Sequence, residues 1–133
     1  MRRRSILRVA GLAAFPLAGC SGGGSDEATV EMTDGFRFDP GSITVDTGTT
    51  VTWENVGTVG HTVTAYGDDI PAGAVYFASG GFDSEDAARD ATDGGIVEAG
   101  EPYTHTFGVA GEYAYFCVPH EGSGMTGTVR VRE

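Results

Sequence analysis

The sequence predicts an all-β domain, a sandwich or open barrel of about eight strands. Glycine accounts for 22 of 133 residues, and the helix formers lysine and glutamine are absent. Short runs rich in Val, Thr, Tyr and Phe alternate with turn signals built from Gly, Pro and Asp. Without about the first 28 residues, roughly 105 residues remain, a common size for one domain.

Turn signals divide the first half of this domain into short strands. We expect strands near residues 29–33, 36–38, 43–46 and 50–55, and another from about 61 to 66. In the fourth strand, alternation places Val51 and Trp53 on one face, and Thr50, Thr52 and Glu54 on the other. This pattern is typical of a strand that packs on a core with one face.

Residues 67–95, which we call the excursion, interrupt the strand rhythm. Asp83 or Ser84 can cap a short helix there, with acidic residues in its first turn. The acidic residues do not follow the calcium-loop pattern, which favours a solvated acidic face over a calcium site. After the excursion, strands are expected over 103–107, 111–117 and 126–132.

The first 20 residues are interpreted as an export signal with a lipobox. Three arginines precede an apolar stretch that Arg8 interrupts and that is shorter than the about 20 residues needed to span a bilayer. Arg3-Arg4 resembles a twin-arginine signal, and the segment 17–20 resembles a lipobox in which Cys20 is acylated. The alternative is an ordinary cleavage site with an unrelated cysteine. Residues 21–28 then form a flexible Gly/Ser linker, and 29–133 form the domain.

The charge of the exported chain excludes one class of partner. Removal of the signal leaves four arginines against 19 acidic residues, a net charge of −15. Nucleic-acid binding needs clustered basic residues, so no nucleic-acid partner is expected. The balance resembles that of halophilic proteins; the alternative is a merely acidic exported protein.

Cys117 has no partner for an internal disulfide if Cys20 carries lipid, so it is either an inert buried thiol or bound to something. It opens a C-x2-H-x4-M pattern with His120 and Met125, and His61 begins an expected strand that can meet this loop. Zinc rarely takes methionine and iron–sulfur clusters need more cysteines, whereas two histidines, one cysteine and a weak methionine suit copper. His105 lacks such a context and is expected to be an ordinary histidine.

The motifs "VTWEN", "GHTV" and "GEYAYFCVPHEGSGMTGTVRV" resemble the blue (type 1) copper proteins of the cupredoxin family. The resemblance is to plastocyanins and, given the lipobox and acidity, most of all to halocyanin. It implies a Greek-key β-sandwich holding one Cu(I)/Cu(II) ion, with His61, Cys117 and His120 as equatorial ligands and Met125 as the axial one. Thr62 replaces the asparagine of many relatives, and its hydroxyl and N–H are expected to brace the site. The Gly60 carbonyl is expected to make a further weak axial contact.

The resemblance implies a membrane-tethered one-electron carrier rather than an enzyme. The expected location is the extracytoplasmic face of the cell membrane, with the chain a lipid-anchored monomer. The expected partners are membrane redox complexes, a quinol-oxidising donor and an oxidase or reductase as acceptor. Two alternatives stay open: a lipoprotein that stores or delivers copper, and an interaction lipoprotein that binds no metal.

Overall fold

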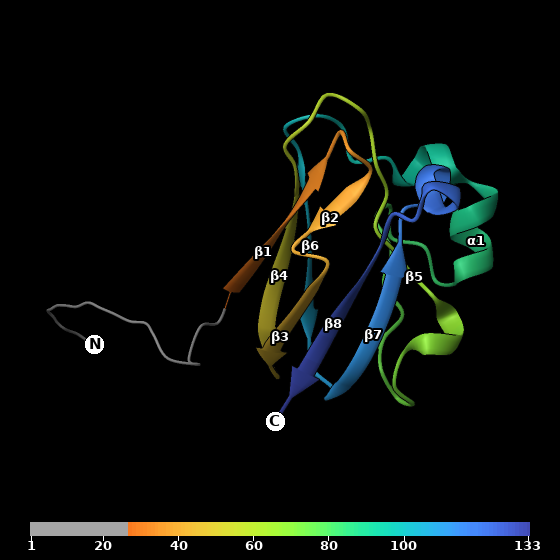
Figure 1. Cartoon of the computed structure of the whole chain (residues 1–133). Coiled ribbons are helices and arrows are strands. Elements are labelled where there is room, and N and C mark those ends of the chain that lie inside the picture. Colours follow the sequence, from red (N-terminus) through yellow and green to blue (C-terminus); the bar gives the residue numbers. More distant parts are fainter. Residues whose placement is uncertain (1–26) are drawn as a thin grey trace, which may run out of the picture.

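A computed structural model describes residues 27–133, in which eight strands form two four-stranded sheets packed face to face (Figure 1). One sheet has the order β2-β1-β4-β6 and the other β3-β8-β7-β5. The strands are β1 (Glu27–Thr33), β2 (Arg37–Asp39), β3 (Ser42–Asp46), β4 (Thr49–Asn55), β5 (Thr64–Ala65), β6 (Pro102–Phe107), β7 (Gly111–Phe116) and β8 (Thr126–Arg132). The predicted all-β sandwich is confirmed. The export signal, Cys20 and most of the expected linker lie outside the described residues.

The sheets combine antiparallel and parallel pairs. β1 runs parallel to β4, and β3 runs parallel to β8, while the other four pairs are antiparallel. Parallel strands cannot be joined by a tight hairpin, and both parallel pairs consist of strands that are not consecutive. From β2 to β7, consecutive strands alternate between the two sheets, so the chain crosses between them at each connection. β7 and β8 are antiparallel neighbours, and the connection between them carries the Cys-His-Met pattern.

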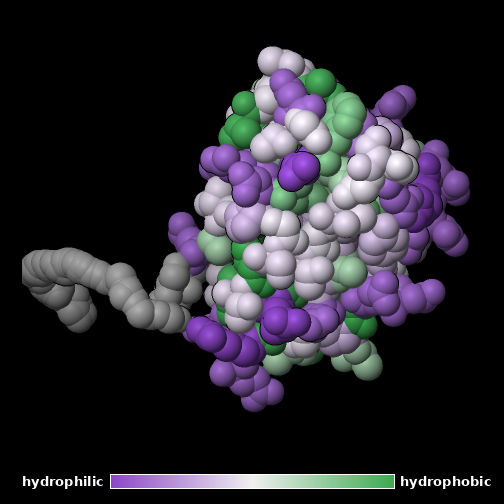
Figure 2. All heavy atoms as spheres, in the orientation of Figure 1, coloured by the Kyte–Doolittle hydropathy of each residue, from purple (hydrophilic) through white to green (hydrophobic). Residues whose placement is uncertain are grey.

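The core lies between the inner faces of the two sheets. In β4, Val51 and Trp53 are fully buried and Glu54 is exposed, which confirms the predicted alternation. Trp53 packs edge-on against Tyr115 of the opposite sheet, with ring centroids 5.4 Å apart. Full burial of one Val or Leu side chain stabilises a fold by about 1.5–3 kcal/mol, so this interface is the main source of stability. The surface in Figure 2 is mainly hydrophilic or intermediate, with small apolar patches.

Two strands differ from the expectation by more than one residue at an end, and the other differences are of one residue. β1 begins at Glu27, two residues early, because Glu27 and Ala28 pair with the parallel strand β4. The expected strand 61–66 shrinks to the two residues of β5, because the N–H groups of residues 61–63 bind partners outside a strand ladder. Those partners are the Val97 carbonyl, the Cys117 sulfur and the Ser79 hydroxyl.

The excursion contains the 3-10 turns η1 (Gly67–Asp69) and η2 (Thr92–Gly95) and the short helix α1 (Glu85–Asp90). Ser84 caps α1 by accepting from the Ala87 N–H, as one of the two expected caps. Phe77 is buried and stacks near Trp53, and the Tyr76 hydroxyl donates to the Ala65 carbonyl at 2.8 Å, so both residues fasten the excursion to the sandwich. No helix within residues 27–133 has the length and apolar character needed to cross a membrane.

Candidate metal centre

The connection between β7 and β8, residues 117–125, is a closed loop that we call the C-terminal loop. It contains the 3-10 turn η3 (Val118–Ser123), with a proline in its first turn, where a missing N–H costs nothing. The Cys117 N–H donates to the Met125 carbonyl at 3.0 Å, which ties the two ends together. Gly124 ends the turn with φ of 87°, a conformation that glycine adopts without strain. Met125 is fully buried and, with Cys117, belongs to the core cluster.

His61 reaches the loop from a segment that is fixed on both sides. Its N–H donates to the Val97 carbonyl at 3.2 Å, and its carbonyl accepts from the Val97 N–H at 2.6 Å. Upstream, the Asn55 side chain donates to the carbonyls of Val59 and Val97. Asp34 accepts from the N–H groups of Thr58 and Val59 and from the Thr58 hydroxyl. The approach to His61 is therefore held by backbone and side-chain hydrogen bonds.

Three donor atoms meet where these segments face one another. The Nδ1 atoms of His61 and His120 are 3.1 Å apart, and the Cys117 sulfur lies 3.3 Å from Nδ1 of His120 and 3.8 Å from Nδ1 of His61. His61 and Cys117 are fully buried, whereas His120 is half-buried. This is a compact metal-binding set with one imidazole near the surface. His105 is not part of it: it lies on β6 and stacks on Phe77.

Thr62 links the segment of His61 to the C-terminal loop through hydrogen bonds. Its N–H donates to the Cys117 sulfur at 3.3 Å, and its hydroxyl oxygen accepts from the Val118 N–H at 2.8 Å. The Thr64 hydroxyl donates to the same oxygen at 3.3 Å. Next to His61, Gly60 packs so tightly that an added Cβ would lie 2.7 Å from Cγ2 of Ile96, so a side chain there would displace its neighbour.

Burial shifts the pKa values of two donors, His61 and Cys117. It lowers the pKa of His61, and the nearby His120 lowers it further, which favours the neutral imidazole that metals bind. Burial also raises the pKa of the Cys117 thiol, against the opposing effect of hydrogen bonds from the N–H groups of Thr62 and His120. A metal ion that binds the thiolate must therefore displace a proton.

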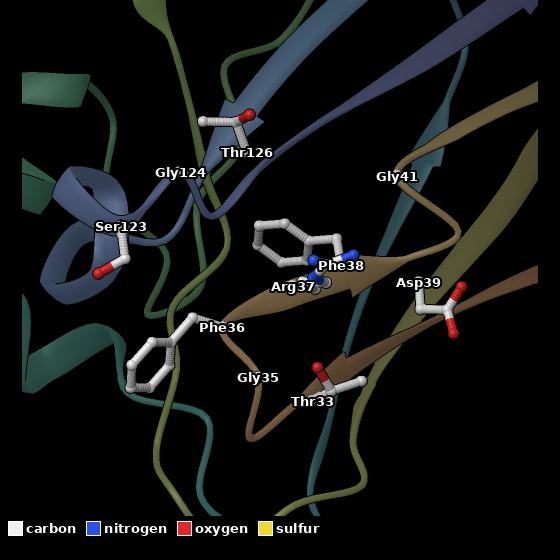
Figure 3. A pocket seen from close by; sticks show the side chains of 10 residues that line it. All are labelled: Thr33, Gly35, Phe36, Arg37, Phe38, Asp39, Gly41, Ser123, Gly124 and Thr126. Carbon is white, nitrogen blue, oxygen red and sulfur yellow. The ribbon is translucent and has the colours of Figure 1, made fainter.

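Two features next to the metal centre are not revealed by local sequence patterns. Phe36, with φ of 60°, stacks on the His120 ring at a centroid distance of 4.2 Å and an interplanar angle of 15°. Phe36 also lines an open groove of about 620 Å³ between the β1–β2 turn and the end of the C-terminal loop (Figure 3).

The second feature is an ion pair between Arg89 of α1 and Glu121. The hydrogen bond from Arg89, and after it the one from the Tyr66 hydroxyl, lower the pKa of Glu121. The only sequence signal for either feature is the position of Glu121 directly after His120.

The donor set fits copper. Two imidazole nitrogens and one thiol converge, and the methionine that ends the loop is bound through its backbone to Cys117. A His2Cys set with a weak methionine is typical of blue-copper sites, and zinc sites rarely include methionine.

Comparisons with known proteins agree with this chemistry. Residues 25–132 match the family model "Copper binding proteins, plastocyanin/azurin family". The chloroplastic plastocyanin of Tetradesmus obliquus is 35% identical over 132 residues, covering 96% of this chain and 83% of that protein. The plastocyanin of Scenedesmus fuscus is 38% identical over 95 residues, covering 71% and 86%.

Among solved structures, oxidised plastocyanin from Dryopteris crassirhizoma superposes with a TM-score of 0.56 at 28% identity, over 78% of this chain and 99% of that one. The sandwich is therefore cupredoxin-like, as expected. A family match over nearly the whole described region, together with the convergent donors, leads to one conclusion. The chain belongs to the plastocyanin/azurin family of copper-binding proteins and is an electron carrier, not an enzyme, with a single type 1 copper site at His61, Cys117, His120 and Met125.

Proposed function

We propose that the chain is a membrane-tethered one-electron carrier in which His61, Cys117 and His120 are the strong ligands and Met125 is the weak axial one. The observation that carries this proposal is the meeting of two Nδ1 atoms and one sulfur within 3.8 Å of one another, from segments 56 residues apart. Bound copper supplies the one-electron Cu(I)/Cu(II) couple. The finer assignment, with Gly60 as a further weak axial contact, follows the family pattern.

The chain's own contribution is a donor arrangement that stays the same in both oxidation states. The Cys117 N–H is bonded to Met125, the Thr62 N–H points to the Cys117 sulfur, and the Thr62 hydroxyl holds Val118. Such outer contacts orient ligands and tune a metal site. Because the donors need not rearrange, electron transfer requires little reorganisation.

His120 is the proposed route for the electron. Its ring is half-buried, whereas the other donors are buried, so it lies nearest to a partner. Val59, in the connection that leads to His61, is 38% exposed, and Pro119, Gly122 and Gly124 of the C-terminal loop are also exposed. A small apolar docking surface around His120 suits redox partners that must dissociate quickly. In concentrated salt the Debye length falls to about 3 Å or less, so docking would depend on this surface more than on the acidic residues.

The proposed setting is the extracytoplasmic face of a cell membrane, as for a halocyanin, with acylated Cys20 as anchor and the residues between Cys20 and β1 as tether. Support comes from the Leu-Ala-Gly-Cys sequence at 17–20 and from the net charge of −15 after signal removal. The proposed partners are a quinol-oxidising complex as donor and an oxidase or reductase as acceptor. Cys20→Ser should release the protein from membranes in the producing cell; a Cys20→Ser protein that stays in the membrane fraction would contradict lipid anchoring.

The test of the site is the visible spectrum of the purified chain titrated with Cu²⁺ and then with a reductant. An intense blue band that bleaches reversibly by one electron is expected, and Cys117→Ala should abolish it. His120→Gly should open a position that added imidazole fills; an unchanged spectrum would show that His120 is not a ligand. A chain that stores or delivers copper would instead release the ion readily and exchange electrons slowly with itself.

A further inference from the structure

Arg89, in the excursion, binds the C-terminal loop directly beside His120. Its Nη1 donates to Oε1 of Glu121 at 2.8 Å, and its Nη2 donates to Oε2 at 3.2 Å. The same guanidinium also binds Glu85, one helical turn earlier, at 2.8 Å. Arg89 is thus held by its own helix and by the loop at once, and Figure 1 shows α1 next to the coil of η3.

A second contact reaches the residue on the other side of the loop. Cζ of Arg89 lies 4.3 Å from the ring centroid of Phe116, which is fully buried and directly precedes Cys117. Tyr66 stacks on the Phe116 ring at 4.3 Å and donates its hydroxyl hydrogen to Oε2 of Glu121 at 2.6 Å. Arg89 and Tyr66 therefore both contact Phe116, just before Cys117, and Glu121, just after His120.

The ion pair between Arg89 and Glu121 differs from the ion pairs that the other arginines of the described chain make. Arg130 with Glu112 and Arg132 with Asp46 join neighbouring strands, and their arginine side chains are 57% and 59% exposed. The Arg89 and Glu121 side chains are 35% and 32% exposed, and the contact is bidentate. A fork-to-fork pair fixes orientation as well as distance, and partial burial reduces its screening by salt.

We infer that Arg89 is a positioning residue of the metal centre, which holds Cys117 and His120 in place through Phe116 and Glu121. This inference rests on the proposed copper site. It gives the excursion a role, because α1 supplies the anchor for the loop that carries three of the four donors. Arg89 also offsets the Glu121 carboxylate, which would otherwise leave an uncompensated negative charge beside His120.

Two measurable consequences distinguish a positioning role of Arg89 from a contribution to folding alone. Without the guanidinium, the loop should open more often in the metal-free chain and release copper sooner in the loaded one. The uncompensated carboxylate should also stabilise the cupric state and lower the reduction potential. Since residues that orient ligands typically contribute about 10- to 100-fold in metal affinity, we expect copper loss to accelerate by about tenfold.

The experiment compares Arg89→Gln, Arg89→Lys, Glu121→Gln and the double variant Arg89→Gln/Glu121→Gln in the full chain, with Arg130→Gln as matched control. Three quantities are measured: hydrogen exchange of the Gly124 and Met125 amides in the metal-free chain, the rate of Cu²⁺ transfer to EDTA, and the reduction potential. Arg89→Gln should speed both rates and lower the potential, and Arg89→Lys should lie between it and the unaltered chain. The double variant should recover the potential but not the loop protection, because the charge is balanced while the contact is still missing.

Arg89→Gln values equal to those of Arg130→Gln in all three measurements would overturn the inference. A failure of the proposed function looks different: the unaltered chain would form no blue centre with Cu²⁺. In that case amide exchange in the metal-free chain still decides whether Arg89 holds the loop.

Discussion

Replacing Thr62 by valine tests whether its hydroxyl holds the C-terminal loop. Thr62 is 1% exposed, and its Oγ1 accepts from the Val118 N–H at 2.8 Å and from the Thr64 hydroxyl at 3.3 Å. Valine keeps the volume but offers no acceptor. The Thr64 hydroxyl can rotate to another acceptor, whereas the direction of the Val118 N–H is set by the backbone.

The expected loss of stability follows from that single amide. A buried donor left without a partner costs about 1–3 kcal/mol, and Val118 is half-buried, so we expect about 1–2 kcal/mol. This corresponds to a factor of about 5–30 in the folding equilibrium. Urea unfolding of the metal-free chain, followed by the fluorescence of its single tryptophan, measures the change in unfolding free energy.

Thr62→Ser is the matched control, because it keeps the hydroxyl and loses only one methyl group, worth about 0.8 kcal/mol. Since the two losses of stability overlap, the deciding measurement is hydrogen exchange of the Val118 amide. It should be protected in the unaltered chain and in Thr62→Ser, and exchange about 5- to 30-fold faster in Thr62→Val. Equal Val118 protection in both variants would refute the bracing role of the hydroxyl.

Three more predictions concern packing, charge and the axial donor. Gly127→Ala should destabilise the fold by about 1–3 kcal/mol, because the new Cβ would lie 2.5 Å from the buried Tyr115 ring. The control is Gly122→Ala, in which no atom lies within 4 Å of the new Cβ. The midpoint of urea unfolding should fall in the first variant and stay almost unchanged in the second. Hydrogen bonds from the Thr58 and Val59 N–H groups and from the Thr58 hydroxyl lower the pKa of Asp34. The ionised carboxylate therefore contributes to stability above the ordinary aspartate pKa, and this contribution disappears as pH falls through the lower pKa of the folded chain. Asp34→Asn should flatten the plot of unfolding free energy against pH below about pH 4, and parallel plots for the two chains would contradict this. Met125→Leu should keep the blue band and raise the reduction potential measured by voltammetry, since a weak donor to the cupric state is lost; complete loss of copper would argue against an axial role.

Local patterns in the sequence were sufficient for most of the sandwich. Period-two alternation around Trp53, turn signals built from Gly, Pro and Asp, and the cap at Ser84 are short-range features, and the structure places strands and helix accordingly. Strand pairing is not short-range, so the parallel partners of β1 and β3 and the early start of β1 came only from the structure. The strand expected at 61–66 was too long because its N–H groups have partners elsewhere in the chain.

Three of the four donors could be predicted from a local feature of the sequence, because a cysteine, a histidine and a methionine lie within nine residues of one loop. The surroundings of these donors became known only from the three-dimensional structure. They include the distance of His61 from Cys117, the stacking of Phe36 on His120, and the ion pair between Arg89 and Glu121. Each of these depends on where two distant segments lie in space. A stacking contact or a bidentate ion pair needs a match of position and angle, and no spacing along the chain encodes that match.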